Sequence, residues 1–164
     1  IQLLADGFVP HLVDTLQRTG LPAQRLELEV TEAIALTRER HAPERLRHLR
    51  DRGVRITLDD FGRGHASLSL LRDLPLDAVK VDATFLDGLT ESEQAQALLR
   101  AVIGLAHALR LDVIAEGVEH EWQREALAAL GCDAIQGYLI SPPVGGDAIP
   151  EMLGQIPALR RFAA

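Results

Sequence analysis

The sequence contains a single cysteine, Cys132, and only 4% aromatic residues. One cysteine excludes an internal disulfide and a cysteine-based zinc site, so we expect its side chain to be a small buried apolar group. With so few aromatic side chains, the core must be built from Leu, Val, Ile and Ala. No apolar run approaches the roughly 18 residues that a membrane span requires.

The chain has 164 residues, of which 47% are hydrophobic and 25% charged, an ordinary composition for one globular domain. Its net charge of −7 argues against electrostatic binding to long nucleic acid, but not against a small anionic ligand held through a metal ion. The sequence opens at Ile1 without an initiator methionine, so we expect a fragment. We also expect a cytoplasmic protein, with any membrane anchor carried by other domains of a longer parent.

Strand-like and helix-like segments alternate along the chain. The apolar patterns predict strands at 25–31, 54–60, 78–82, 112–116 and 134–136. Helices are predicted at 7–19, 38–51, 66–73, 92–109 and 120–130, with a weaker one at 147–155. Repeated strand-then-helix units indicate a parallel sheet.

Polar residues gather where the predicted strands end: Glu29 and Glu32, Asp59 and Asp60, Lys80 and Asp82, Glu116, and Gln136. Both α/β barrels and doubly wound sheets place their sites at these strand ends. No glycine-rich nucleotide fingerprint follows any strand, and five contributing strands suit a closed ring better than one crevice. We therefore predict an α/β fold that is an incomplete TIM-like (β/α) barrel of about five βα units, since a complete barrel has eight.

The adjacent carboxylates Asp59 and Asp60 end the apolar run 54–58. Two acids at the end of a buried strand are costly unless a hydrogen-bond network or a cation compensates them. Carboxylate oxygens are hard ligands, suited to magnesium, manganese or calcium. A solvated aspartate turn is the ordinary alternative.

Five short motifs follow one another along the chain: Glu29-Val30-Thr31-Glu32, Asp59-Asp60-Phe61-Gly62, Lys80-Val81-Asp82, Ala115-Glu116-Gly117-Val118-Glu119 and Gln136-Gly137-Tyr138. Their order and spacing resemble those of EAL domains, bacterial phosphodiesterases of the second messenger cyclic di-GMP. The resemblance covers essentially the whole chain and implies one truncated EAL domain over residues 1–164. It further implies a modified α/β barrel that hydrolyses cyclic di-GMP to linear pGpG with two magnesium or manganese ions.

The resemblance also implies roles for individual residues. It makes metal ligands of Glu29, Asp59, Asp60 and Glu116. It places Lys80, Glu116 and Gln136 in catalysis, with Lys80 positioning the attacking water or neutralising developing charge. It assigns loop anchoring or support of the ligands to Glu32, Glu119 and Asp82.

Simpler interpretations of these residues stay open at this point. Lys80 could pair with Asp82, which points the same way two residues further on. Glu116 could be a helix-capping acid, and Gln136 could satisfy backbone groups. The domain could be a catalytically degenerate module that binds cyclic di-GMP or a protein partner, or a fragment without a function of its own.

The sequence departs from the family pattern in two places. The Glu-Ala-Leu motif and an Asn-x-Ser strand, which supply two further metal ligands, are not in this sequence, so we expect very slow hydrolysis or none. The loop after Asp60 reads Arg63-Gly64-His65-Ala66 instead of the usual Thr or Ser, Gly, Tyr and Ser. The resemblance links this loop to the subunit interface, so regulation is expected to differ.

Alternation along the strands predicts a charge pair. If Glu29 and Asp59 point to the inner face of the sheet, then Glu27 and Arg55, two and four residues earlier, do so as well. An unpaired charge on an inner barrel face is costly. We therefore expect Glu27 to pair with Arg55 or another inward cation.

A five-strand arc cannot close, so strands 25–31 and 134–136 would have unpaired sides, and such edges promote association. We therefore predict that the chain forms homo-oligomers through the barrel edge or the loop after Asp60, or aggregates. Light scattering at micromolar concentration tests this. A monodisperse, cooperatively melting monomer would show that the sheet closes in another way.

Overall fold

One parallel sheet organises the structure. The computed structural model describes residues 2–31, 42–63 and 68–155. The sheet has five strands in the order β1-β2-β3-β4-β5, so strands that follow one another in sequence are also neighbours in space. The strands are β1 (Glu27–Thr31), β2 (Arg55–Phe61), β3 (Ala78–Val81), β4 (Asp112–Ala115) and β5 (Ala134–Ile135). This confirms the predicted α/β class and the five βα units.

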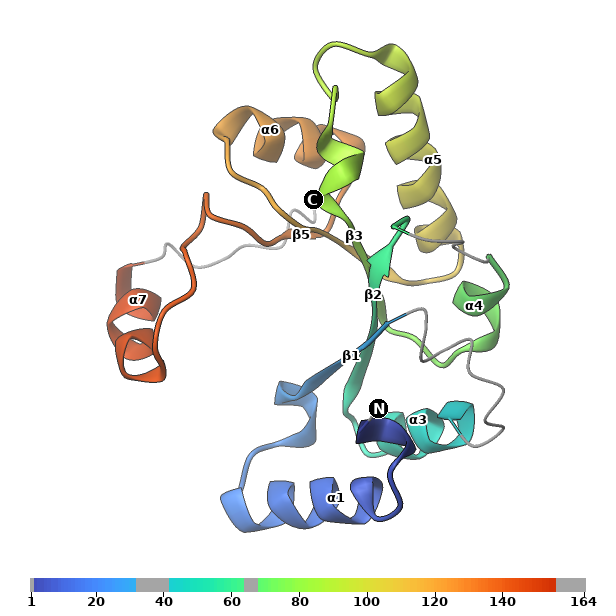
Figure 1. Ribbon diagram of the computed structural model, residues 1–164, viewed down its shortest axis with the longest axis vertical. Helices are drawn as coiled ribbons and strands as arrows, with labels where there is room; N and C mark the ends of the chain where they lie inside the picture. Colours follow the sequence, from blue (N-terminus) through green and yellow to red (C-terminus); the bar gives the residue numbers. More distant parts are fainter. Residues whose placement is uncertain (1, 32–41, 64–67, 156–164) are drawn as a thin grey trace.

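Helices connect the strands (Figure 1). The α-helices are α1 (Phe8–Thr19), α3 (Ala42–Arg50), α4 (Leu68–Asp73), α5 (Glu93–Ala108), α6 (Glu121–Leu130) and α7 (Ile149–Gln155). Each lies within a predicted helix. The predicted helical residues 38–41 and 66–67 lie outside the described residues.

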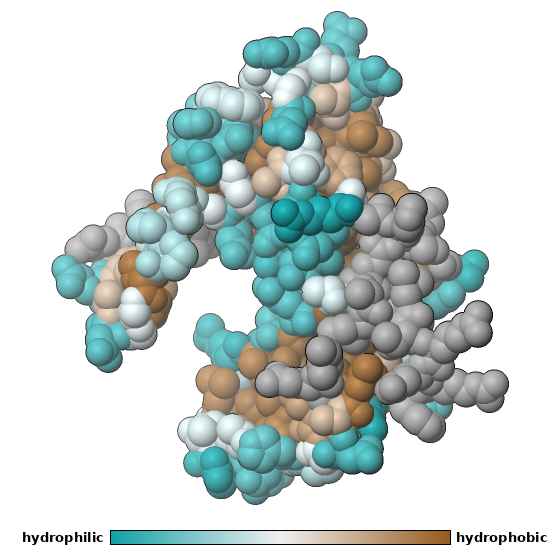
Figure 2. Space-filling view, viewed as in Figure 1, coloured by the Kyte–Doolittle hydropathy of each residue, from teal (hydrophilic) through white to brown (hydrophobic). Residues whose placement is uncertain are grey.

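The two faces of the sheet differ in polarity. One face carries fully buried aliphatic side chains, among them Ile56, Leu58 and Val79, and these belong to the same core cluster as Leu49 and Leu99 of the helices. In Figure 1, α3, α4 and α5 lie along one side of the sheet. On the other side, Figure 2 shows a broad hollow with hydrophilic residues where the middle of the sheet meets it. The polar face of the sheet is therefore the side that α3, α4 and α5 leave open.

Short 3-10 helices shift two predicted strand boundaries. The 3-10 segments are η1 (Gln2–Leu4), η2 (Ala23–Arg25), η3 (Ala83–Leu86) and η4 (Gly146–Ala148). Strand β1 begins at Glu27 instead of residue 25 because Arg25 belongs to η2. Strand β3 ends at Val81 because Asp82 caps η3, its carboxylate accepting a hydrogen bond of 3.0 Å from the Thr84 amide. A carboxylate next to free amide groups favours a cap over a further strand residue.

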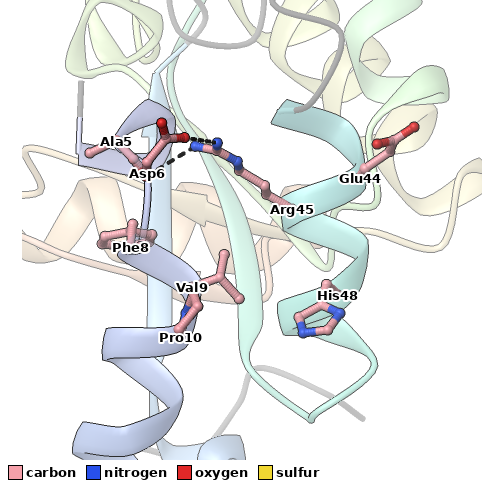
Figure 3. A pocket seen from close by; sticks show the side chains of 9 residues that line it. Ala5, Asp6, Phe8, Val9, Pro10, Glu44, Arg45 and His48 are labelled. Atoms are coloured by element: carbon pink, nitrogen blue, oxygen red, sulfur yellow. Dashed lines mark hydrogen bonds and ion pairs between the residues drawn. The ribbon is translucent and has the colours of Figure 1, made fainter.

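A surface pocket lies between the start of α1 and α3, with Phe8, Pro10 and His48 among its lining residues (Figure 3). At its edge, the Arg45 guanidinium donates hydrogen bonds to the carbonyl oxygens of Leu3 and Ala5 and to the Asp6 carboxylate. Arg45 thus ties the first turn of the chain to α3. None of the residues that sequence analysis proposes for a site lines this pocket.

Cys132 is 1% exposed, which confirms it as a small buried group. Burial raises the pKa of its thiol to about 11, so the side chain stays protonated at neutral pH. Its sulfur lies 3.4 Å from the Val113 carbonyl oxygen of β4, in the core.

None of the helices in the described ranges combines the length and the apolar character needed to cross a membrane.

Two neighbouring leucines of α5 provide a matched test of the core. Leu99 is fully buried and Leu98 is 57% exposed. We expect Leu99→Ala to lower the free energy of unfolding by about 2–5 kcal/mol, because it leaves a cavity between the helix and the sheet. Leu98→Ala, the control, should change it by less than about 1 kcal/mol. Urea unfolding followed by circular dichroism measures both, and equal losses would contradict the packing described here.

Candidate active site

A bulge at the end of β2 sets the position of the two adjacent aspartates. The pairing of β2 with β3 runs through Leu58↔Val79 and resumes at Phe61↔Val81, so Asp59 and Asp60 together stand opposite Lys80. A bulge of this kind changes the direction of side chains and recurs near active sites. Here it leaves Asp59 on the inner face with Lys80.

Asp60 is the extra residue of the bulge. Its φ of 58° lies in the left-handed region, which is uncommon for a residue other than glycine. Its carboxylate contacts Arg63 at 3.3 Å and is 40% exposed. Asp60 therefore lies next to Asp59 in sequence but, in this structure, turns toward the loop.

Lys80 is the centre of the candidate site. Its Nζ lies 2.8 Å from Oε1 of Glu29, 2.7 Å from Oε1 of Glu116 and 3.5 Å from Oδ1 of Asp59. These acids come from β1, from the residue after β4 and from β2. The side chain of Lys80 is only 4% exposed, and Lys80 is the only lysine in the sequence. We call Glu29, Asp59, Lys80 and Glu116 the upper tier.

The protonation state of Lys80 follows from its neighbours. Burial by itself lowers the pKa of a lysine, because it penalises the charged form. The hydrogen bonds that Lys80 donates to Glu116 and Glu29, together with the charge of Asp59, outweigh burial and leave the pKa raised. The ammonium group is therefore charged at neutral pH.

The predicted convergence of Glu29, Asp59 and Glu116 at one end of the sheet is confirmed by these distances. The expectation that Asp60 lies beside them is wrong, because the bulge turns its carboxylate to Arg63. The alternative partner of Lys80, Asp82, is engaged elsewhere: it caps η3 and contacts Arg63 at 3.3 Å. Burial of Asp82 tends to raise its pKa, but hydrogen bonding at Thr84 and the charge of Arg63 outweigh this and lower it. Asp82 thus supports the loop after β3.

The remaining predicted site residues either lie at the rim of the upper tier with exposed side chains or fall outside the described residues. Gln136 follows β5 with an exposed side chain, and its backbone amide donates to the Ala115 carbonyl at 2.8 Å. Glu119 also has an exposed side chain. Glu32 lies outside the described residues.

A glycine brings the loops after β4 and β5 together. A Cβ on Gly137 would lie 2.2 Å from the carbonyl oxygen of Val118, so only glycine fits this close approach. In the same place the Val118 amide donates to the carbonyl oxygen of Gln136 at 3.1 Å. The loops that carry Glu116 and Gln136 are thereby held side by side.

Gln123 belongs to none of the sequence motifs, yet it supports the Glu116 loop from α6. Its Oε1 accepts hydrogen bonds from the amides of Glu119 and His120, at 2.7 and 2.9 Å, and the residue is 9% exposed. The available signal was its spacing, because a glutamine three residues after a helix cap completes a capping box.

A second basic side chain, that of Arg55, lies on the same face of the sheet as Lys80. Arg55 contacts Glu27 through Nε at 3.4 Å and Asp112 through a terminal nitrogen at 2.9 Å. The Glu27–Arg55 contact confirms the predicted charge pair. We call Glu27, Arg55 and Asp112 the lower tier.

The upper tier has the donor chemistry that a divalent cation requires. Its carboxylate oxygens are hard ligands, and Oδ1 of Asp59 is buried without a hydrogen-bond partner. Among the described residues, no group of three His, Cys, Asp or Glu residues already stands in a metal-binding arrangement, because the acids turn to Lys80. The residues therefore fit a cation by their chemistry, and their oxygens would turn from Lys80 to hold it.

A parallel α/β sheet with acids and a lysine at the carboxyl ends of its strands has the active-site layout of barrel enzymes. The family model of the EAL domain matches residues 1–143. The chain belongs to the EAL domain family.

Relatives and solved structures agree with this assignment. Cyclic di-GMP phosphodiesterase NbdA of Pseudomonas aeruginosa is 42% identical over 90% of this chain and 19% of its own length. The EAL domain of Mycobacterium smegmatis DcpA is 37% identical, with a TM-score of 0.87 over 95% of this chain and 71% of that one.

A metal complex is among the similar structures. The manganese/cyclic di-GMP complex of Klebsiella pneumoniae BlrP1 is 33% identical, with a TM-score of 0.79 over 87% of this chain and 36% of that one. The same protein is also known as a calcium/cyclic di-GMP complex. The chain spans 20% and 24% of the length of two further curated relatives that it matches.

The Lys80 network makes a prediction about stability. Lys80→Met keeps the length of the side chain but removes the charge that three carboxylates share. We expect the free energy of unfolding to fall by about 3 kcal/mol, because removing one partner leaves the others partly buried and uncompensated. Urea unfolding measures the loss. The control Arg72→Met breaks the exposed pair with Asp73 and should leave stability unchanged; an equal effect of both variants would contradict the network.

Proposed function

We propose that this chain is the catalytic portion of a cyclic di-GMP phosphodiesterase, which hydrolyses the cyclic dinucleotide to linear pGpG with two magnesium or manganese ions. The observation that carries the proposal is the meeting of Glu29, Asp59 and Glu116 at one buried lysine. Family membership supports it, as does the named activity of the relative NbdA. The calcium and manganese complexes of BlrP1 support a divalent cation.

The acids of the upper tier are the proposed cation ligands. Glu29, Asp59 and Glu116 would hold one cation, and Asp60 a second, after turning from Arg63. A bound divalent ion supplies charge that polarises a phosphate and lowers the pKa of water. The protein itself carries a net charge of −7, so an anionic substrate needs local positive charge to approach these carboxylates.

Lys80 and Gln136 have roles that do not depend on being ligands. The Lys80 ammonium is held rigidly by its hydrogen bonds and stays charged, so it can stabilise negative charge that develops on the phosphate. Gln136 lies at the rim with an exposed amide that can donate a hydrogen bond to a phosphate oxygen. Glu119, Asp82 and Glu32 are proposed to anchor the surrounding loops.

Self-association and location are further parts of the proposal. Strands β1 and β5 each have one neighbour in the sheet of the described residues. Free strand edges favour pairing with another chain, so a second copy is the proposed partner there or at the loop after Asp60. The proposed compartment is the bacterial cytoplasm.

Ligand binding and turnover test the proposed function separately. We expect cyclic di-GMP to bind in the presence of Ca²⁺, measured by isothermal titration calorimetry. With Mn²⁺ we expect at most slow conversion to linear pGpG, measured by chromatography and stopped by EDTA. Asp59→Asn should abolish binding and turnover, because it removes a buried ligand oxygen at the centre of the site.

The control for this experiment is Asp133→Asn, which changes the same residue type outside both tiers, where Asp133 contacts His107 at 2.8 Å. It should bind as the unaltered chain does. Binding without any turnover would favour a degenerate binding module. A chain that neither binds nor hydrolyses cyclic di-GMP would contradict the proposal.

A further inference from the structure

The two tiers of the inner face are built on the same strands. In the upper tier, Lys80 reaches Glu29 of β1 and Glu116 after β4. In the lower tier, Arg55 reaches Glu27 of β1 and Asp112 of β4. Each cation therefore joins β1 to the β4 segment, across the strands that lie between them.

Arg55 contacts an acid of the neighbouring strand β1 and also an acid of β4, which is not a neighbour of β2 in the sheet. It stands directly beside Glu27, its Cα partner in β1. Asp112 lies two strands away from β2, opposite Ala78 of β3. Neighbouring strands are about 4.8 Å apart, so the backbones of β2 and β4 are roughly 10 Å apart, and the side chains of Arg55 and Asp112 together bridge this separation.

Leu28 and Val30 of β1 pack against the hydrophobic core, but few contacts set the position of β1 within the plane of the sheet. Within the described sheet, β1 pairs only with β2, so its backbone ladder holds it on one side. The Arg55 contacts add a second restraint, close to Glu29 because Glu27 is two residues away on the same face. At the other end, Asp112 begins the strand that leads to Glu116.

We propose that Arg55 is a positioning residue: by joining β1 to β4, it sets the separation at which the acids of the upper tier meet Lys80. Arg55 itself touches none of the proposed metal ligands. Its effect on metal binding rests on the proposed function, whereas the mechanical link between the two tiers does not.

The test uses Arg55→Met in the full 164-residue chain, with two readouts. The first is the rate at which an amine-reactive ester modifies Lys80, followed by mass spectrometry; Lys80 is the only lysine, so one peptide reports the integrity of the upper tier. The second is the affinity for Mn²⁺ alone, measured by electron paramagnetic resonance. We expect about tenfold faster modification and about tenfold weaker Mn²⁺ binding, as is usual when residues that orient ligands are lost.

Two controls separate positioning from general destabilisation. Arg50→Met breaks an ion pair of the same 2.9 Å length, with Asp77, in neither tier. Leu99→Ala destabilises the core and leaves both tiers intact. At a temperature where every variant is folded, neither control should change either readout. Arg55→Lys keeps the charge but lacks the fork that reaches two acids, so it should give an intermediate effect.

The outcomes are distinct. Unchanged Lys80 modification and Mn²⁺ affinity in Arg55→Met would overturn the inference, as would equal changes in Leu99→Ala. Faster modification of Lys80 in a chain that binds no Mn²⁺ would support the link between the tiers while contradicting the proposed function. If Arg55→Met does not fold, Asp112→Asn weakens the β4 end of the link, and the same changes in both readouts are expected.

Discussion

A buried ammonium group surrounded by carboxylates holds together the carboxyl ends of the strands. Lys80 is 4% exposed, and burial of a lysine is unfavourable unless opposite charges compensate it. Three acids from three different parts of the chain do so at distances of 2.7 to 3.5 Å. Because three carboxyl groups meet one cation, the site keeps donor oxygens to spare, and this excess makes it suitable for a divalent ion.

The position of these acids depends on the backbone. The bulge at the end of β2 gives two aspartates the space of one residue, so Asp59 faces Lys80 while Asp60 turns to Arg63. The close passage of Gly137 past Val118 joins the loops after β4 and β5. Loop geometry and strand register thus place side chains that are up to about a hundred residues apart in the sequence.

Most of the fold follows from local patterns. Short apolar segments predict strands, and the amphipathic segments between them predict helices. Such strand-then-helix units form a parallel sheet because they can pack in few other ways. The polar residues then lie together at one end of the sheet, because parallel strands have their carboxyl ends on the same side. The pairing of Glu27 with Arg55 follows from the same alternation. The 3-10 segment η3 was missed because one capping carboxylate, Asp82, decides it.

The sequence by itself therefore determined the order of elements, the inward face of β1 and β2, and the family motifs. Only the tertiary structure decided that Asp60 leaves the acid cluster, that Arg55 reaches Asp112 and that Gln123 supports the neighbouring loop. Alternation and strand polarity depend on neighbouring residues, which a sequence displays directly. The contact of Arg55 with Asp112 across β3 depends on strand register, and the turn of Asp60 depends on a bulge. Both exist only once distant segments have packed.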